Sequence, residues 1–550
     1  MNNFNKYLSM KPLKYLYLIL FLVAVSCDLK EDDLPFLDET VFLDPAGAEA
    51  VRDGIYQSLT TYNAQERRIY VENLSGGLMY TSKGGNVNAA DQSSLNSMKV
   101  GYNPDAEAMW EGLYNAVHRS NKAINNISLD EKTGSELTRF SDVLGHAYFV
   151  RAWSYFRLVN LWKEIPVWLS VPNSPYETHL AVSSESEVFL QIISDLNQAK
   201  ILLNGTAGVG YPKKYAASML LSKVYMKIAT SPELQNISDE ASSWSNAYVE
   251  AKIVYDSGEY SLAQNFSDLF DMYSGGENLS ESIFELQISA DASNSQMGRN
   301  FSPSGWKETM AFGWFRVSHI FHDYHVKTYG TRTGNGPNGT QVHDLRYPAT
   351  YISQYMSIGG WNKGRMAKSY PSGGWMGNLG ASHPYLFKYA EKDRNSTSQY
   401  DSKNVIVMRY AELLLMLSEI SNELGNGEEM IYLNPVLERA GVDDQYKRAE
   451  WSLGQDSFRD AIMDEYKFEL IGEGNDHFHA RRRGFSYFLA NTIKRNNDKI
   501  NNNDQTHYYP WKRYGKNGNA TIGILFSEDE SEVMKFPIPL SETLRNNLID

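Results

Sequence analysis

The stretch LTRFSDVLGHAYFVRAWSYFRLVNLWKEIPVWL, residues 137–169, indicates how this chain folds. Its side chains recur at three- and four-residue spacings, which place on one helix face Tyr148, Ala152, Tyr155 or Phe156, and Val159. Ala152 is small enough to let a second helix approach closely. The stretch therefore predicts a long helix that packs against a neighbouring helix.

Amphipathic segments of similar length lie on both sides of it. Asp44 can cap a helix that begins at Pro45, since proline suits a first helical turn. Further helical patterns cover residues 107–127, 186–203, 214–230 and 243–262. Helix pairs with Trp, Tyr and Ala at facing positions are similar to tetratricopeptide hairpins. We expect a mostly α fold, a right-handed tetratricopeptide-like superhelix over residues 45–274, with an ordinary helical domain as the alternative.

The pattern changes near Gly275, where a region covering residues 275–550 begins. ESIFELQIS, residues 281–289, alternates apolar and polar side chains and predicts a strand. Residues 290–404 are rich in Gly, Ser, Asn, Tyr and Trp, with little helical periodicity. Irregular segments of such length are often functional. We expect a loop-rich ligand-binding region with short β-hairpins, followed by a return to helices.

Composition narrows the function. Hydrophobic residues make up 42% of the 550 residues and charged residues 21%, which is typical of a globular protein. The net charge of −14 argues against a general nucleic-acid binder, which needs a basic face. Aromatic residues reach 13%, more than an ordinary core requires.

The N-terminus has the pattern of a secretory signal over residues 1–26. Three lysines precede the apolar run YLYLILFLVAVS, residues 15–26, which is too short to span a membrane comfortably. Cys27, the single cysteine of the chain, follows directly. It has no partner for an internal disulfide, and its position is that of the acylated cysteine of bacterial lipoproteins. A chance cysteine after a plain signal peptide is the alternative. Residues 27–44 then form an acidic tether.

Several motifs, in order along the chain, resemble the SusD/RagB family of outer-membrane nutrient-binding lipoproteins. They are RAWSYFRLVNLWKEIPV (151–167), VMRYAELLLMLSEISNELGNG (407–427), LNPVLERAGV (433–442), DEYKFELIGEGNDHFHARRRG (464–484) and the closing PIP (537–539). The chain departs from the family at Lys163, where glycine is usual, at Tyr466 and Lys467, where the family favours two arginines, at Asp476, which replaces an arginine, and at His479, which replaces an aspartate.

The resemblance implies a surface lipoprotein that captures oligosaccharide and acts as a lid on a TonB-dependent outer-membrane transporter, the SusC-like partner. It implies no enzyme activity, no cofactor and no metal. A peptide ligand is a variant within the same family. A helical lipoprotein glycosidase is an alternative from another class, since 66 acidic residues leave room for a catalytic pair.

The charges of these motifs are interpreted as structural. Arg151, Arg409 and Arg439 lie on segments otherwise rich in apolar residues. Arginine forms planar, bidentate pairs with carboxylates, which suits buried contacts that fix helix register. Partners of the right type are Glu412, Glu465, Glu469 and Glu473.

No catalytic motif is evident. The chain lacks a G-x-S-x-G elbow, an H-E-x-x-H helix and a phosphate-binding glycine loop. His322 and His325, like His477 and His479, have no obvious third metal ligand, and we interpret them as hydrogen-bonded or exposed side chains.

Aromatic residues are the strongest candidates for a binding site. Tryptophans flanked by glycine have no helix face to bury them and a mobile backbone, so they suit stacking on the apolar face of a sugar. The candidates in residues 290–404 are Trp306, Trp314, Trp361, Tyr370 and Trp375, and those in an N-terminal loop are Tyr80 and Tyr102. Packing between helices and loops is the alternative for each ring.

Overall fold

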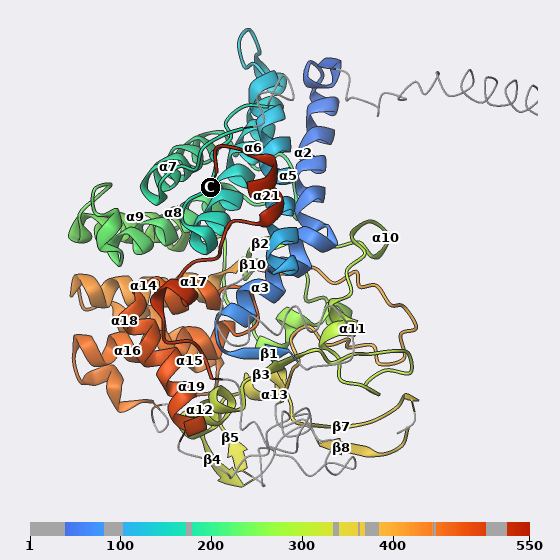
Figure 1. Ribbon diagram of the computed structural model, residues 1–550, viewed down its shortest axis with the longest axis vertical. Coiled ribbons are helices and arrows are strands. Elements are labelled where there is room, and N and C mark those ends of the chain that lie inside the picture. The colour runs from blue at the N-terminus through green and yellow to red at the C-terminus, as the bar shows by residue number, and fades with distance from the viewer. Residues whose placement is uncertain are drawn as a thin grey trace, which may run out of the picture.

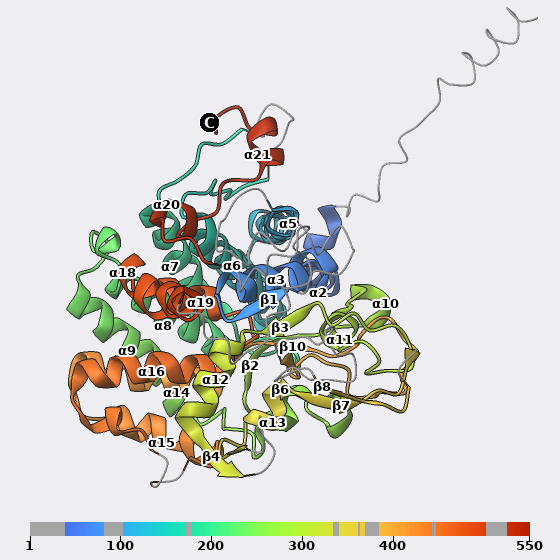
Figure 2. The same ribbon diagram turned by 60° about the horizontal axis from the view of Figure 1, so that its bottom comes forward.

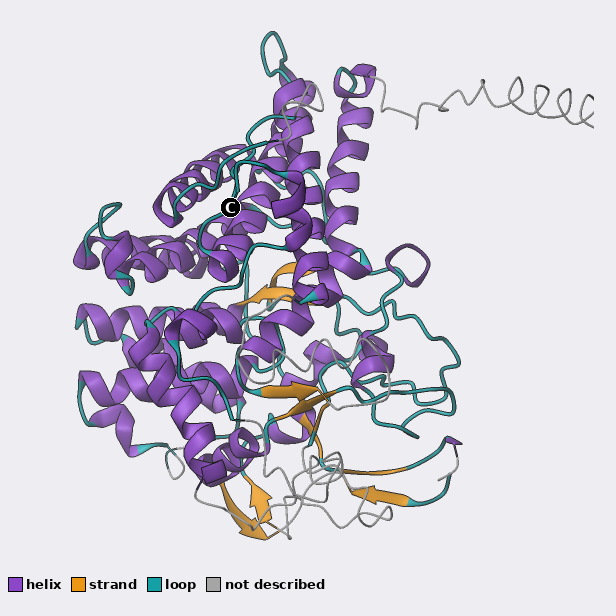
Figure 3. Ribbon diagram, viewed as in Figure 1, coloured by secondary structure: helices purple, strands orange, loops and turns teal. Residues whose placement is uncertain are grey.

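The structure is a computed structural model, which describes residues 39–81, 103–171, 179–333, 340–360, 363–368, 384–442, 444, 447–501 and 525–549. Helices dominate these residues and gather on one side of the molecule, whereas most strands and long loops lie on the other (Figure 3). The predicted mostly helical fold is confirmed. None of the described helices is long and apolar enough to cross a membrane.

The N-terminal half is an array of helices in which successive members pack on one another (Figure 1). Its helices are α2 (Pro45–Thr60), α3 (Arg67–Ser75), α5 (Pro104–Asn126), α6 (Gly134–Trp162), α7 (Glu185–Leu202), α8 (Lys214–Ala229) and α9 (Glu240–Asp256). Asp44 caps α2 as predicted, because its carboxylate accepts from the backbone N–H of Gly47 at 3.0 Å. The predicted helix of the 137–169 stretch is α6, which ends at Trp162.

Lys163 ends α6 in a backbone conformation that favours glycine. Its φ is 64° and its ψ is −58°. A side chain makes a positive φ costly, which gives a physical reason for the glycine that the family usually has at this place.

The C-terminal half adds a second group of helices, most of which lie below the first, whereas its last helix lies beside α5 and α6 (Figure 1). They are α14 (Tyr410–Leu424), α15 (Glu429–Arg439), α16 (Gln455–Leu470), α17 (Asp476–Arg481), α18 (Phe485–Phe488), α19 (Arg495–Asn501), α20 (Glu530–Val533) and α21 (Leu540–Arg545). Helix α14 packs on α9, α15 and α16, so it joins the two groups. Figure 2 shows α21 on the same side of the molecule as α5.

Short elements form most of the strand- and loop-rich side of the molecule (Figure 3). The helices are α10 (Ala290–Ser293), α11 (Met297–Phe301), α12 (His319–Tyr329) and α13 (Tyr347–Thr350). The strands are β1 (Met79–Thr81), β2 (Ser282–Leu286), β3 (Phe315–Val317), β4 (Gly330–Thr333), β5 (Thr340–Val342), β6 (Tyr351–Ile352), β7 (Gln354–Met356), β8 (Met366–Lys368), β9 (Tyr385–Leu386) and β10 (Val405–Arg409).

The strands tie distant parts of the chain together. Antiparallel pairing orders one sheet β1-β3-β9-β6, with Met79 opposite Val317, so an N-terminal strand lies within the C-terminal half. The predicted strand in residues 281–289 is β2, and it pairs with β10, with Leu286 opposite Val405. The pairs β4–β5 and β7–β8 are short antiparallel ribbons of the expected kind.

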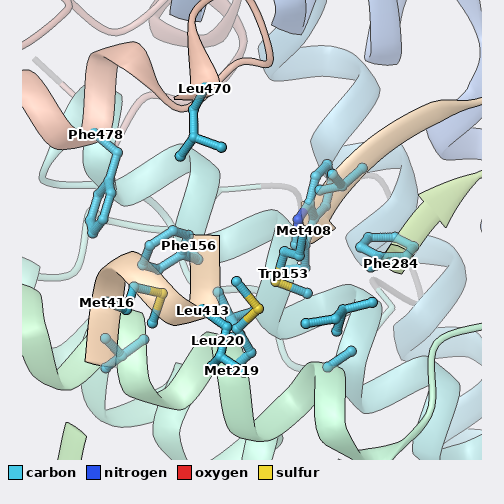
Figure 4. Packing of buried hydrophobic residues seen from close by; sticks show 14 of the residues in the cluster. Trp153, Phe156, Met219, Leu220, Phe284, Met408, Leu413, Met416, Leu470 and Phe478 are labelled. Atoms are coloured by element: carbon cyan, nitrogen blue, oxygen red, sulfur yellow. The ribbon is translucent and has the colours of Figure 1, made fainter. Parts of the chain in front are cut away.

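A continuous hydrophobic core joins the two helical groups (Figure 4). Trp153 of α6 meets Phe284 of β2 edge-on at 5.9 Å between ring centroids, and Phe156 lies 5.3 Å from Phe478 of α17. Leu413 and Met416 of α14 lie in the same cluster. Burying each such side chain contributes about 1.5–3 kcal/mol, so this interface fixes how the two groups sit together.

A buried ionic network crosses the C-terminal half. Arg409 donates to Glu473 at 2.7 and 2.9 Å and lies 2.8 Å from Glu281. Glu469 receives bonds from both Arg409 and Arg439. Arg151 forms a bidentate pair with Asp195 at 2.6 and 2.8 Å, a partner that the motifs did not indicate. The structural interpretation of these arginines is confirmed.

Candidate ligand-binding cleft

A cleft of about 260 Å³ opens among the irregular segments. Its walls come from η6 (Met272–Ser274), the segment that links α10 to α11, and the loop of residues 389–405. We call it the Asp401 cleft. Among its lining residues are Tyr273, Ser295, Gly298, Tyr389, Glu391, Lys392, Ser398, Tyr400, Asp401 and Lys403.

Two tyrosines of the cleft are exposed to solvent. Tyr273 is 56% exposed and Tyr400 is 37% exposed. The hydroxyl of Tyr273 donates to Glu391 at 3.1 Å, which orients that ring. Ser398 bonds both the backbone N–H and the carbonyl of Tyr400, at 3.1 and 2.8 Å, so a tight turn holds the second ring in place. The cleft thus offers flat apolar faces whose edges carry hydrogen-bonding groups.

One wall of the cleft is held by two carboxylates, the buried Glu66 and the partly buried Asp401. Asp401 accepts from the backbone N–H of Gly298 at 2.6 Å, and Glu66 accepts from the N–H of Gln296. A Cβ on Gly298 would lie 2.4 Å from the Asp401 carboxylate, so the close approach requires glycine. Burial raises the pKa of Asp401 to about 7 and that of Glu66 to about 7, because the ionised forms are poorly solvated.

Two lysines of the cleft bond to backbone carbonyls. Lys403 donates to the carbonyls of Phe270 and of Lys388, the latter at 2.7 Å. Burial lowers the pKa of Lys403 to about 7 and the pKa of Lys392 well below its usual range. Hydrogen-bond donors and hydrogen-bond acceptors therefore line the same small cleft, which suits a polar ligand with many hydroxyl groups.

A stack of rings lies next to the cleft. Trp314 is parallel to Phe312, with 4.7 Å between ring centroids and 5° between planes, and the guanidinium of Arg299 lies 4.1 Å from the Phe312 ring. Arg299 also donates to Gln399 at 3.0 Å, which joins the stack to the loop of the cleft. Trp314 itself is only 7% exposed.

Two other candidate rings are buried as well. Trp306 is 8% exposed, its indole N–H donates to the Glu391 carbonyl at 2.7 Å, and Arg394 lies over its ring at 4.3 Å. Tyr80 is 4% exposed and donates to Asn496 at 2.8 Å. In this structure, Trp306, Trp314 and Tyr80 pack against protein, and their contact with a ligand stays a prediction.

The glycines beside the buried tryptophans have a packing role. Gly305 has a φ of 80°, and a Cβ there would lie 2.3 Å from the Ser357 hydroxyl. Gly313 has a φ of 55°, and a Cβ would lie 2.5 Å from the Tyr385 ring. These glycines let the backbone turn and approach its neighbours closely.

The remaining candidates lie outside the described residues. These are Tyr102, Trp361, Tyr370, Trp375 and the expected lipidation site Cys27. Their roles stay predictions.

The four histidines of the two motifs are buried and hydrogen-bonded, as interpreted. His325 lies between Asp344 at 2.8 Å and the Tyr351 hydroxyl at 2.9 Å, and His322 contacts the Tyr347 hydroxyl at 2.9 Å. His477 contacts the Ser75 hydroxyl at 2.8 Å, and His479 lies 3.4 Å from Glu412. Within the described ranges, no three His, Cys, Asp or Glu side chains form a group that could hold a metal.

Sequence reasoning missed the cleft residues, although it placed a functional region over residues 290–404. The loop EKDRNSTSQYDSKN, residues 391–404, has no tryptophan and no periodicity. The available signal was its density of small polar residues around Tyr400.

The fold and the cleft define a helical-repeat protein with a ligand-sized cleft between its loops. Two family models match the chain: one described as the SusD family over residues 280–550, and one described as starch-binding, associating with the outer membrane, over residues 37–226. The chain belongs to the SusD/RagB family.

Individual relatives agree with this assignment. A SusD-like protein of Formosa agariphila is 27% identical over 488 residues, which cover 84% of this chain and 89% of that protein. A SusD homologue of Bacteroides thetaiotaomicron has a similar fold, with a TM-score of 0.70, 19% identity and coverage of 92% and 96%. A structure described as being with xylogluco-oligosaccharide matches with a TM-score of 0.66, 18% identity and coverage of 91% and 97%.

Proposed function

We propose that this chain is a cell-surface lipoprotein that binds oligosaccharides without cleaving them and delivers them to a TonB-dependent outer-membrane transporter. The observation that carries the proposal is the Asp401 cleft, which combines two exposed tyrosines with densely placed hydrogen-bonding groups. Sugars present apolar ring faces and many hydroxyls, and such a lining is complementary to both. The structural neighbour described as being with xylogluco-oligosaccharide supports the same ligand class.

The anchor and the partner complete the proposal. Acylation of Cys27 would hold the chain to the outer membrane, facing the cell exterior, with residues 27–44 as a tether. Stacked helix pairs form extended surfaces that commonly bind other proteins. We therefore assign the contact with the SusC-like transporter to the N-terminal helical array.

The candidate rings outside the described residues belong to the same proposal. Trp361, Tyr370, Trp375 and Tyr102 would extend the binding surface by further stacking contacts. The buried Trp306 and Trp314 would support it from below, so their replacement should change stability together with affinity. Tyr80 packs in a separate cluster with Phe488 and Phe526, and its replacement should chiefly change stability.

A binding assay with matched variants tests the cleft. The unacylated mature chain is titrated with a panel of oligosaccharides by calorimetry, together with the variants Tyr400→Ala and Tyr400→Phe. The control is Leu453→Ala, because Leu453 follows η10 (Ala449–Ser452) and is 68% exposed. Loss of a stacking ring should weaken binding roughly three- to tenfold, whereas the Phe variant keeps the ring. Equal affinities for Tyr400→Ala and the wild-type protein would show that the cleft is not the site.

The alternatives are decided by the same samples. Glu391 and Asp401 line one cleft, and a pair of carboxyl groups of which one has a raised pKa is the arrangement of a glycosidase. Steady release of shorter sugars, lost in Asp401→Asn, would establish an enzyme in place of a binder. Binding of peptides but of no sugar in the panel would establish the peptide-binding variant.

A further inference from the structure

A second, smaller cavity lies away from the Asp401 cleft. It is partly open to solvent and is lined by residues of α12, α16 and the segment formed by η11 (Leu489–Lys494) and α19, and its volume is about 30 Å³. A cavity needs about 10–15 Å³ to hold one water molecule, so this cavity has room for a small polar group. We call it the Lys467 cavity.

Three cations beside this cavity share one buried carboxylate. Asp464 lies 3.1 Å from the ammonium of Lys467 and 3.3 Å from the guanidinium groups of Arg495 and Arg448. The Tyr324 hydroxyl also donates to Asp464. The nearby cations hold the pKa of Asp464 at about 2 although burial opposes ionisation, so this carboxylate is charged at neutral pH and its oxygens are already used.

Positive charge therefore remains in excess around the cavity. Arg448 has a second carboxylate, Glu450, at 3.6 Å, but the Glu450 side chain is 45% exposed and solvent weakens its effect. Lys467 is 9% exposed, and Asp464 is the carboxylate within ion-pair distance of it among the described residues. Buried cations without full compensation are costly, and an anion supplies the missing charge.

The cavity is also lined by donors in a suitable arrangement. Lys467 and Arg495 line it together with Ser318, Asn491, Thr492 and Asn496. The guanidinium of Arg495 lies 4.5 Å from the Tyr324 ring centroid, and this cation–π contact holds the guanidinium beside the cavity. Arginine and lysine beside hydroxyl and amide groups form the usual surroundings of a bound anion.

We propose that the Lys467 cavity binds one small anionic group, either a halide ion or a single carboxylate. The inference does not depend on the proposed sugar binding, since it rests on charges and a cavity outside the Asp401 cleft.

Bromide is the probe for the test. Urea unfolding of the wild-type chain is followed while bromide replaces sulfate at constant ionic strength. Arg495→Gln removes one cation whose side chain is 34% exposed, so this variant should still fold. The control is Arg459→Gln on α16, whose arginine pairs with Glu423 and Asp456.

Bromide should stabilise the wild-type chain and Arg459→Gln in a saturable way relative to Arg495→Gln. At ten times the dissociation constant, the unfolding constant should fall about elevenfold. An anomalous bromide peak between Lys467 and Arg495 in a crystal would locate the ion. Identical bromide dependence in the three proteins would overturn the proposal, even with such a peak, because it would then mark an adventitious ion only.

Competition separates the two sources of the anionic group. Glucuronate and glucose are added to the bromide titration at equal concentration. A shift of the bromide dependence by glucuronate and not by glucose assigns the site to a sugar carboxylate, whereas no shift by either assigns it to a free halide. Both results support a small-anion site, and an equal shift by the neutral sugar would contradict it.

Discussion

Replacing Arg409 by methionine should destabilise the protein strongly. The Arg409 guanidinium lies 2.8 Å from Glu281, 2.5 Å from Glu469 and 2.7 Å from Glu473. Its side chain is 1% exposed, so water cannot solvate the carboxylates that the substitution leaves behind. Removing one partner of a buried ion pair costs about 3–5 kcal/mol, which is a large part of a typical stability of about 5–15 kcal/mol.

The structure places the expected loss near the lower end of this range. Glu281 and Glu469 keep Arg439, and Glu473 keeps the Lys388 ammonium at 2.7 Å. We therefore expect a loss of about 3 kcal/mol, because no carboxylate becomes wholly unpaired. With a urea dependence of about 3 kcal/mol per molar, the unfolding midpoint should fall by about 1 M.

Urea unfolding followed by circular dichroism measures this change, and Arg139→Met is the control. Arg139 makes a bidentate pair with Glu49 at 2.6 and 2.7 Å, but the two side chains are 39% and 30% exposed. The urea midpoint of Arg139→Met should therefore stay close to that of the wild-type protein. Equal midpoints for Arg409→Met and Arg139→Met would refute the reasoning.

Three further substitutions test local features by urea unfolding. Lys163→Gly should stabilise the chain by about 1 kcal/mol, because it relieves a φ of 64°; a loss would contradict the strain. Gly112→Ala should destabilise it despite alanine's better helix propensity, because a Cβ would lie 2.8 Å from the Ala64 Cα; unchanged stability would mean that the backbone yields there. Burial raises the pKa of Asp476 to about 7, above about 3.9 in the unfolded chain, so this carboxyl should make stability fall as pH rises between these values. Asp476→Asn should show a smaller slope and be the more stable form at pH 8, with Asp401 and Glu66 keeping their own shares; equal slopes would exclude titration of Asp476.

The sequence predicts local elements well where one periodic face decides the outcome. The spacing around Ala152 predicts α6, the Asp44–Pro45 pair predicts the start of α2, and alternation in residues 281–289 predicts β2. Pairing is different, because β2 meets β10, which begins at Val405. Nothing in the local pattern of either strand identifies its partner.

The binding site was harder to predict because aromatic type and glycine content do not determine exposure. The glycines before Trp306 and Trp314 allow tight packing, and both rings are buried. The exposed rings of the cleft are Tyr273 and Tyr400, which lie in polar segments without a distinctive motif. Their exposure follows from how segments more than a hundred residues apart meet, which is a tertiary property.

Charged side chains of the same type have different roles here, and the number of their partners distinguishes them. Arg409 faces three carboxylates and is buried in the fold, whereas the cations of the Lys467 cavity share Asp464. Full compensation makes removal of a charge costly to folding, and incomplete compensation beside a cavity makes addition of a counter-charge favourable. The substitutions Arg409→Met and Arg495→Gln should therefore have different effects on unfolding. Arg409→Met should lower stability with or without bromide, whereas Arg495→Gln should chiefly remove the stabilisation by bromide.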